Sequence, residues 1–225
     1  QAPAWKFLEN LNINEGLIKA RLRSICGLPV VEGADRIMDW INKESNKFWP
    51  VFGTNLANLE IKSLSVENTS VPQNPFELKC DEAKNIGLEF SDRANFWLGY
   101  YNEPRLIYTA PAFRMGPWKA SNRRTVHIAI DVFADEGTEL FAPLEGEVFK
   151  AEYRDSKLDY GGVIILKHTT PHKDEFFTLY GHLDPMFLSN LKVGDKIEKG
   201  QRFCQLGAPN VNGGWAPHVH FQLAL

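Results

Sequence analysis

The last eleven residues of the chain, WAPHVHFQLAL, place two histidines one residue apart. In an extended segment residues i and i+2 point to the same side, so His218 and His220 are expected to lie side by side. Two other segments carry similar chemistry: RTVHIAIDVF contains His127 and Asp131 as H-x-x-x-D, and LYGHLDP contains His182. Imidazole is the commonest metal ligand, yet many isolated His-x-His pairs bind nothing. Whether this pair binds a metal must therefore be judged from the combination of motifs.

Together these motifs contain enough ligands for a catalytic metal and leave two histidines over. An imidazole and a carboxylate from one segment plus an imidazole from another make three nitrogen and oxygen ligands, the set used by catalytic zinc when water fills its fourth position. The remaining imidazoles can take a proton from that water or stabilise a developing oxyanion, which are the two tasks of hydrolysis. The residue types therefore indicate a zinc cofactor and metal-dependent hydrolysis.

The other candidate side chains are interpreted as structural. His168, at the end of GGVIILKH, and His172, in the following loop, are expected to be strand-end and surface residues. Asp184 follows GHL and is expected in a turn. Tyr180 and Trp215 could line a groove, but aromatic residues in β domains more often belong to the core.

Composition limits the classes of protein. The chain has 225 residues, 44% hydrophobic and 24% charged, which is typical of a globular protein with one large domain or two small ones. Its formal net charge of -3 argues against nucleic acid or an anionic membrane as the main partner. Three widely spaced cysteines without a C-x-x-C pair predict reduced thiols. The N-terminal QAPAWKFLEN lacks signal-peptide features, so a cytoplasmic location is expected.

The pattern along the chain predicts a small helical part followed by a β domain. Residues 1–56 are expected to be mostly helical, with helices over about 12–23 and 34–48. Residues 57–105 are expected to form a strand and turn-rich connector, and 106–225 contain short β-branched or aromatic runs separated by Gly, Asp and Pro. We therefore expect a mainly β fold, an antiparallel sheet or barrel-sandwich domain with a helical N-terminal segment, α+β overall.

Five motifs follow one another within residues 106–225: HIAID, GTELFAPLEGEVFKA, YGHL, VGDKIEKGQRFCQLG and PHVHFQL. In this order they resemble the lysostaphin/LytM-type zinc metallopeptidases, which are cell-wall endopeptidases. The resemblance implies that zinc is held by His127, Asp131 and His220. It also implies that His182 and His218 are the unliganded catalytic pair, without saying which of them is the base. A peptide or a small amide would be the substrate.

Two positions depart from the family pattern. The family usually has glycine inside the first motif, as H-x-G-x-D, where this chain has Ala129. Before H-x-H the family usually has a Ser/Thr-Gly turn, where this chain has NGGWAP. These differences bear on substrate contacts more than on metal binding.

The first hundred residues resemble a narrower group through ARLRSICGLP, MDWINKESNKFWPVFG and YYNEPRLIYTAPAFR. These segments are similar to the middle of fusion proteins that join an aminoglycoside-phosphotransferase-like domain, a peptidase-like domain and a class III pyridoxal-phosphate aminotransferase. The missing initial Met and the end directly after an apolar strand pattern also indicate a fragment of a longer chain, with other domains as partners. Two alternatives stay open: a non-catalytic peptidase-like binding module, and a zinc hydrolase of a small amide metabolite.

Overall fold

The computed structural model describes residues 31–56, 61–63, 96–104, 108, 113 and 126–225. The helices and strands in these ranges are, in chain order, α3 (Ala34–Glu44), the 3-10 helix η1 (Ser45–Lys47), β1 (Ile61–Ser63), β2 (Phe96–Gly99), β3 (Glu103–Pro104), β4 (Val126–His127), β5 (Ile130–Phe133), β6 (Glu139–Phe141), β7 (Gly146–Arg154), β8 (Gly161–Thr169), β9 (Glu175–Leu183), the 3-10 helix η5 (Pro185–Asn190), β10 (Lys196–Ile197), β11 (Arg202–Gln205) and β12 (His218–Ala224).

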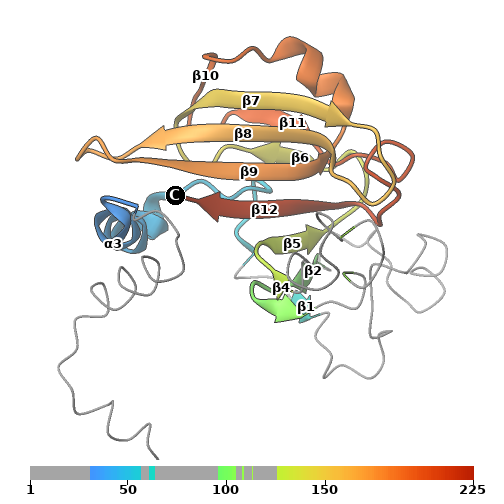
Figure 1. The fold of residues 1–225 in the computed structure, drawn as a ribbon, viewed down its shortest axis with the longest axis horizontal. Helices are drawn as coiled ribbons and strands as arrows, with labels where there is room; N and C mark the ends of the chain where they lie inside the picture. Colours follow the sequence, from blue (N-terminus) through green and yellow to red (C-terminus); the bar gives the residue numbers. More distant parts are fainter. Residues whose placement is uncertain (1–30, 57–60, 64–95, 105–107, 109–112, 114–125) are drawn as a thin grey trace, which may run out of the picture.

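Eight strands form one sheet in the order β1-β2-β5-β12-β9-β8-β7-β10. Every neighbouring pair in it is antiparallel except β1 and β2, which are parallel. Figure 1 shows the long strands β7, β8, β9 and β12 lying side by side, with β6 and β11 as a separate pair. The prediction of a mainly β, antiparallel domain is confirmed, and the important detail for the site is that β12 lies between β5 and β9.

The hydrophobic core joins the main sheet to the β6–β11 pair. Leu140 of β6 and Cys204 of β11 are fully buried in the same cluster as Val219 of β12. Tyr180 of β9 is also fully buried, and its ring lies edge-on to Phe203 of β11 with the centroids 4.9 Å apart. Tyr180 is therefore a core residue, as the sequence led us to expect. The core also packs against β12 through Val219 and so fixes the position of this strand.

The helix expected over about 34–48 is confirmed, because α3 and η1 cover it up to Lys47. The helix packs on the sheet through Trp40, whose ring centroid lies 6.0 Å from that of Phe176 in β9. An ion pair of 2.6 Å joins Arg36 to Asp174 in the turn between β8 and β9. The other helix, expected over about 12–23, lies outside the described residues, and the domain boundaries at 57 and 106 stay predictions.

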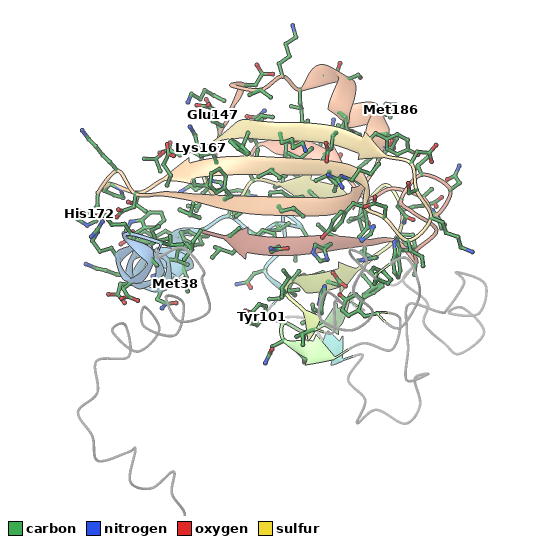
Figure 2. The ribbon with its side chains drawn as sticks, in the orientation of Figure 1. Met38, Tyr101, Glu147, Lys167, His172 and Met186 are labelled. Atoms are coloured by element: carbon green, nitrogen blue, oxygen red, sulfur yellow. The ribbon has the colours of Figure 1, made fainter. Side chains whose placement is uncertain are left out.

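The surface shows two further features that bear on the sequence predictions. His172 lies in the turn between β8 and β9 and is exposed, as expected (Figure 2). In the part of the chain that the structure describes, no helix has both the length and the apolar character needed to span a membrane.

Candidate active site

The register of β12 against its two neighbours builds the site. His220 of β12 lies opposite Asp131 of β5 on one side and opposite Gly181 of β9 on the other. His127 ends β4, and a bend around Ala129 brings it back beside Asp131. Ala129 is buried, so the methyl group that replaces the family's usual glycine is packed within the bend. Three strands therefore bring together the three side chains that the sequence singled out as ligands.

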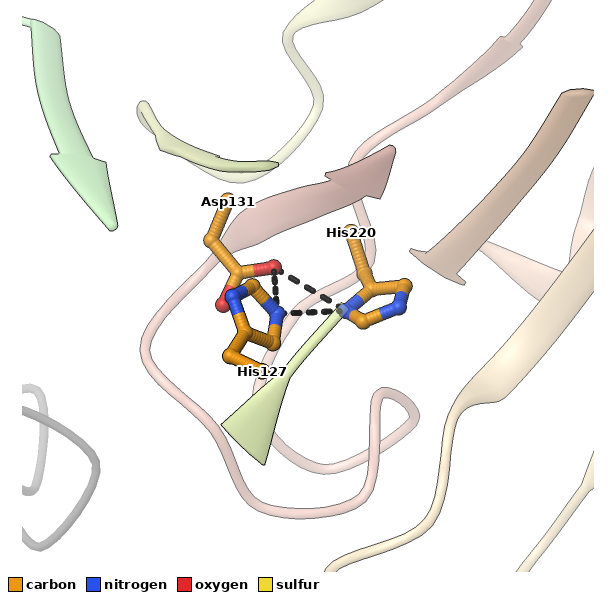
Figure 3. A group of neighbouring side chains, drawn as sticks. All are labelled: His127, Asp131 and His220. Carbon is orange, nitrogen blue, oxygen red and sulfur yellow. Dashed lines mark hydrogen bonds and ion pairs between the residues drawn. The ribbon is translucent and has the colours of Figure 1, made fainter. Parts of the chain in front are cut away.

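Three potential ligand atoms of these side chains form a small triangle, drawn in Figure 3. Nε2 of His127 lies 3.2 Å from Nδ1 of His220 and 3.3 Å from Oδ1 of Asp131. The third side, from Nδ1 of His220 to the same oxygen of Asp131, is 3.0 Å. All three side chains are buried, so a bound ion would be held away from bulk water by protein on most sides.

This triangle fits a tetrahedral metal ion. Zinc binds imidazole nitrogen and carboxylate oxygen at about 2.0–2.2 Å, so two corners of a tetrahedral site are separated by roughly 3.3 Å. The observed separations of 3.0–3.3 Å are close to that value. Two nitrogens and one oxygen also match the ligand set of catalytic sites that keep a fourth position open. His127, Asp131 and His220 could therefore hold a metal ion.

The hydrogen bond of His127 determines which of its nitrogens can bind the metal. Nδ1 of His127 lies 3.1 Å from the backbone oxygen of Tyr100. A carbonyl oxygen only accepts hydrogen bonds, so Nδ1 carries the proton and donates it. Nε2 is then the nitrogen with a lone pair, and it is the atom that faces the triangle.

His182 and His218 lie next to the triangle. Their ring centroids are 4.2 Å apart, and Nε2 of His218 is 3.9 Å from Oδ2 of Asp131. Each Nδ1 donates to a backbone oxygen, His182 to that of Asn212 at 2.9 Å and His218 to that of Ala216 at 2.6 Å. In the neutral rings both Nε2 atoms then have a lone pair, so each imidazole has the protonation pattern of a general base.

Burial sets the charge state of His182. Removing the ring from water lowers the pKa of His182 well below its ordinary value, and the nearby imidazoles of His218 and His220 lower it further. The backbone of His182 has a φ of 63°, in the left-handed region, and its N–H donates to the oxygen of Tyr160 at 2.8 Å. The ring is thus neutral and held in one place.

Two residues of the site were missed in the sequence. The hydroxyl of Tyr160 lies 3.4 Å from Nε2 of His220, and the fully buried Asn212 supplies the carbonyl that orients His182. The Asn-Gly-Gly run at 212–214 is a turn signal, but it does not reveal that the amide is buried. Tyr160 directly precedes a strand pattern and carries no signal of its own.

His168 has the strand-end position expected from the sequence. It lies near the end of β8 and is 2% exposed. Its Nδ1 donates to the oxygen of Glu145 and its Nε2 lies near Oγ1 of Thr178, both at 2.7 Å. Because the polar atoms of the ring have protein partners, the imidazole can be buried at the strand end.

Asp184 and Trp215 have structural contacts. Asp184 caps η5, since its carboxylate accepts from the N–H of Met186 at 2.9 Å, which agrees with the turn expected there. Trp215 is 6% exposed, and its indole N–H donates to the oxygen of Asp159. Its ring also lies edge-on to His182, with the centroids 5.7 Å apart. Trp215 is therefore a buried residue whose ring packs against both catalytic candidates, His182 and His218.

A β domain with a buried His, Asp, His triangle and two further oriented imidazoles defines the class of metal-dependent hydrolases. Sequence comparison gives the family: residues 125–225 match the profile of Peptidase family M23. An "Uncharacterized metalloprotease" of Haemophilus influenzae is 30% identical over 96 residues, which are 43% of this chain and 18% of that relative's length. Residues 125–225 are therefore similar in sequence to metallopeptidases of this family, of the lysostaphin and LytM type.

Solved structures of such peptidases are similar to about half of the chain. A zinc-containing peptidase from Vibrio cholerae is 21% identical, with a TM-score of 0.39, and the match covers 56% of this chain and 32% of that one. The catalytic domain of the antimicrobial peptidase lysostaphin from Staphylococcus simulans is 26% identical, with a TM-score of 0.37, and 56% and 77% are covered. The family assignment rests on the sequence match.

Proposed function

We propose that this domain is a zinc-dependent endopeptidase or amide hydrolase. The observation that carries the proposal is the buried triangle of ligand atoms, 3.0–3.3 Å apart, with two oriented imidazoles beside it. The metallopeptidase family match supports the same chemistry. His127, Asp131 and His220 would hold the zinc. When bound, zinc supplies a Lewis acid that polarises a carbonyl and lowers the pKa of a water to about 7.

The chain's own residues would then manage the protons. His182 and His218 each have Nδ1 hydrogen-bonded to a carbonyl, so Nε2 is the atom that can accept a proton from the attacking water. The protonated ring can then donate that proton to the leaving nitrogen. The other ring would stabilise the developing oxyanion in the state in which its Nε2 is protonated, because its Nδ1–H is already donated to a backbone oxygen. Because the two rings lie in contact, one substrate carbonyl can reach both.

The proposed substrate is a peptide or a small amide. The segment NGGWAP contains Trp215, whose ring lies beside both catalytic candidates. This segment differs from the family's usual turn. We therefore expect weak cleavage of pentaglycine and better activity on a small amide. The family match concerns residues 125–225 alone and does not bear on other domains or on location. The fusion with other domains and the cytoplasmic location therefore stay predictions.

The test compares metal content and hydrolysis in matched variants, with pentaglycine, muropeptides and a panel of small amides as substrates. Asp131→Ala should lose both zinc and activity. His182→Ala and His218→Ala should keep zinc but lose roughly 10²–10⁴-fold in rate, the usual contribution of proton transfer. His172→Ala, an exposed histidine in the turn between β8 and β9, is the control and should keep both.

Two results would contradict the proposal. Stoichiometric zinc in Asp131→Ala would remove Asp131 from the ligand set, and wild-type rates in His182→Ala and His218→Ala would remove their catalytic roles. A zinc-loaded protein that cleaves none of the substrates would instead favour a non-catalytic peptidase-like binding module. Strong pentaglycine cleavage would overturn the preference for a small amide.

A further inference from the structure

We infer that Tyr160 is a positioning residue of the metal centre, whose hydroxyl holds the His220 imidazole in the orientation and tautomer that present Nδ1 to the metal. This inference rests on the proposed function, because it takes His220 as a ligand. Tyr160 lies just before β8, whereas His220 lies on β12, so the contact joins two distant parts of the chain.

The contact with His220 involves the nitrogen that does not face the triangle. Nδ1 of His220 points at Oδ1 of Asp131, 3.0 Å away, while Nε2 lies 3.4 Å from the hydroxyl oxygen of Tyr160. An imidazole that binds metal through Nδ1 must carry its proton on Nε2. The tyrosine oxygen can accept that proton in a hydrogen bond, which favours the metal-binding tautomer and limits rotation of the ring.

The other ligand imidazole is held in the same way. His127 directs Nε2 to the triangle and donates from Nδ1 to the backbone oxygen of Tyr100. In each histidine of the triangle, the nitrogen that faces away from the triangle thus has a hydrogen-bond partner. For His127 the partner is a main-chain atom, whereas for His220 it is a side chain that a substitution can remove.

The position of the Tyr160 ring is built into the sheet. Gly181 lies directly opposite His220 in the β9–β12 register, and a Cβ added to Gly181 would come within 2.5 Å of Cδ1 of Tyr160. The absence of a side chain at Gly181 therefore lets the tyrosine ring reach the metal centre. There the ring lies edge-on to His220, with the centroids 5.1 Å apart, and 5.6 Å from the ring of His182.

The backbone of Tyr160 has a separate role. Its oxygen accepts a hydrogen bond from the N–H of His182 at 2.8 Å, and its N–H donates to Oδ1 of Asp159 at 2.8 Å. Tyr160→Phe keeps these backbone bonds and the packing of the ring, and it removes only the hydroxyl. This variant therefore isolates the contact with His220.

The experiment measures zinc affinity by titrating the zinc-loaded protein with a chelator. Tyr160→Phe should bind zinc about 10–100-fold more weakly than the wild type, the usual cost of losing such a partner of a metal ligand. Tyr153→Phe is the matched control and should have wild-type affinity, because Tyr153 is exposed and its hydroxyl contacts Asp155. Nitrogen-15 NMR of the loaded protein should also show an altered Nε2–H signal for His220 in Tyr160→Phe only.

The outcomes separate this inference from the proposed function. Wild-type zinc affinity and an unchanged His220 signal in Tyr160→Phe would overturn the role of Tyr160 and leave the ligand set intact. A His220→Ala variant that holds zinc as tightly as the wild type would show that His220 is not a ligand, and the proposed metal centre would fail with it. Weaker binding in both variants, with Tyr153→Phe unchanged, supports the inference.

Discussion

At the residue scale, the buried histidines differ in their role: some belong to the candidate active site and one supports the fold. His182 and His218 lie beside the ligand triangle, whereas His168 is buried at the other end of the sheet. The ring of His168 stacks on Phe176 with the centroids 5.0 Å apart. Burial lowers the pKa of His168 below its ordinary value, although the hydrogen bond to the oxygen of Glu145 opposes this shift. His168 thus contributes a neutral, hydrogen-bonded ring to the fold.

This lowered pKa predicts a pH-dependent stability. As the pH falls through 6.5, the ordinary value, the unfolded chain takes up a proton on His168 that the folded chain does not, so the free energy of unfolding decreases. The stabilisation is complete above this pH and is lost progressively below it. Urea unfolding of the wild type and His168→Gln between pH 7.5 and 5 should show a smaller loss in the variant. His172→Gln, at an exposed histidine, is the control. If the free energy of unfolding fell equally steeply with pH in His168→Gln and in the wild type, His168 would not be the source of the pH dependence.

At the element scale, the loop between β11 and β12 acts as one hydrogen-bonded unit around Asn212. The amide nitrogen donates to the backbone oxygens of Gly207 and Trp215, both at 3.0 Å. The amide oxygen accepts from the N–H groups of Gly214 and Trp215, at 3.1 and 2.9 Å. Gly213 has a φ of 93°, and a Cβ there would lie 2.1 Å from the oxygen of Asp159. The Asn-Gly-Gly run therefore folds the loop so that the Asn212 carbonyl meets His182.

This network makes Asn212→Asp a sharp test of the loop. The substitution keeps the shape of the side chain, but a carboxylate oxygen would face the two carbonyl oxygens to which the amide now donates. We expect a loss of roughly 2 kcal/mol or more in the free energy of unfolding, because buried acceptors lose their donors. Hydrolysis should fall as well, with zinc retained. Asn210→Asp, an exposed position in the same loop, is the control. Unchanged unfolding of Asn212→Asp would contradict the role of the network.

At the scale of the whole molecule, residues 31–56 share the core of the peptidase sheet. Phe52 is 8% exposed and belongs to the main hydrophobic cluster. The N–H of Trp49 donates to the oxygen of Pro143 at 2.9 Å, and the N–H of Phe141 donates to the oxygen of Val51 at 2.7 Å. The segment thus adds both apolar surface and backbone hydrogen bonds to the sheet.

Shared packing predicts shared unfolding. Phe52→Ala should lower the free energy of unfolding of the whole domain by about 3–5 kcal/mol, the usual cost of removing a buried aromatic ring. Met38→Ala, at a side chain of α3 that is 40% exposed (Figure 2), is the control and should change the stability by about 0.5 kcal/mol or less. Thermal unfolding followed by circular dichroism checks both variants. A wild-type melting curve for Phe52→Ala would mean that residues 31–56 fold independently of the sheet.

The sequence by itself determined the local features of this protein. The H-x-x-x-D and H-x-H spacings, whose members are two to four residues apart, pointed to His127, Asp131, His218 and His220, and the YGHL motif pointed to His182. Alternating runs likewise predicted the strands of the second half, and helical spacing predicted α3. Such patterns are readable because residues two apart in a strand, and three or four apart in a helix, lie on the same face.

Only the tertiary structure decided how these pieces meet. The place of β12 between β5 and β9 depends on the pairing of strands far apart in the chain, which the composition of one strand does not encode. The Tyr160–His220 contact spans 60 residues and the Asn212–His182 contact spans 30, so neither leaves a local signal. The burial of His168 likewise depends on the tertiary structure, because its partners Glu145 and Thr178 come from other segments. Ligand types are a property of short motifs, whereas the groups that orient them are brought there by packing of the whole sheet.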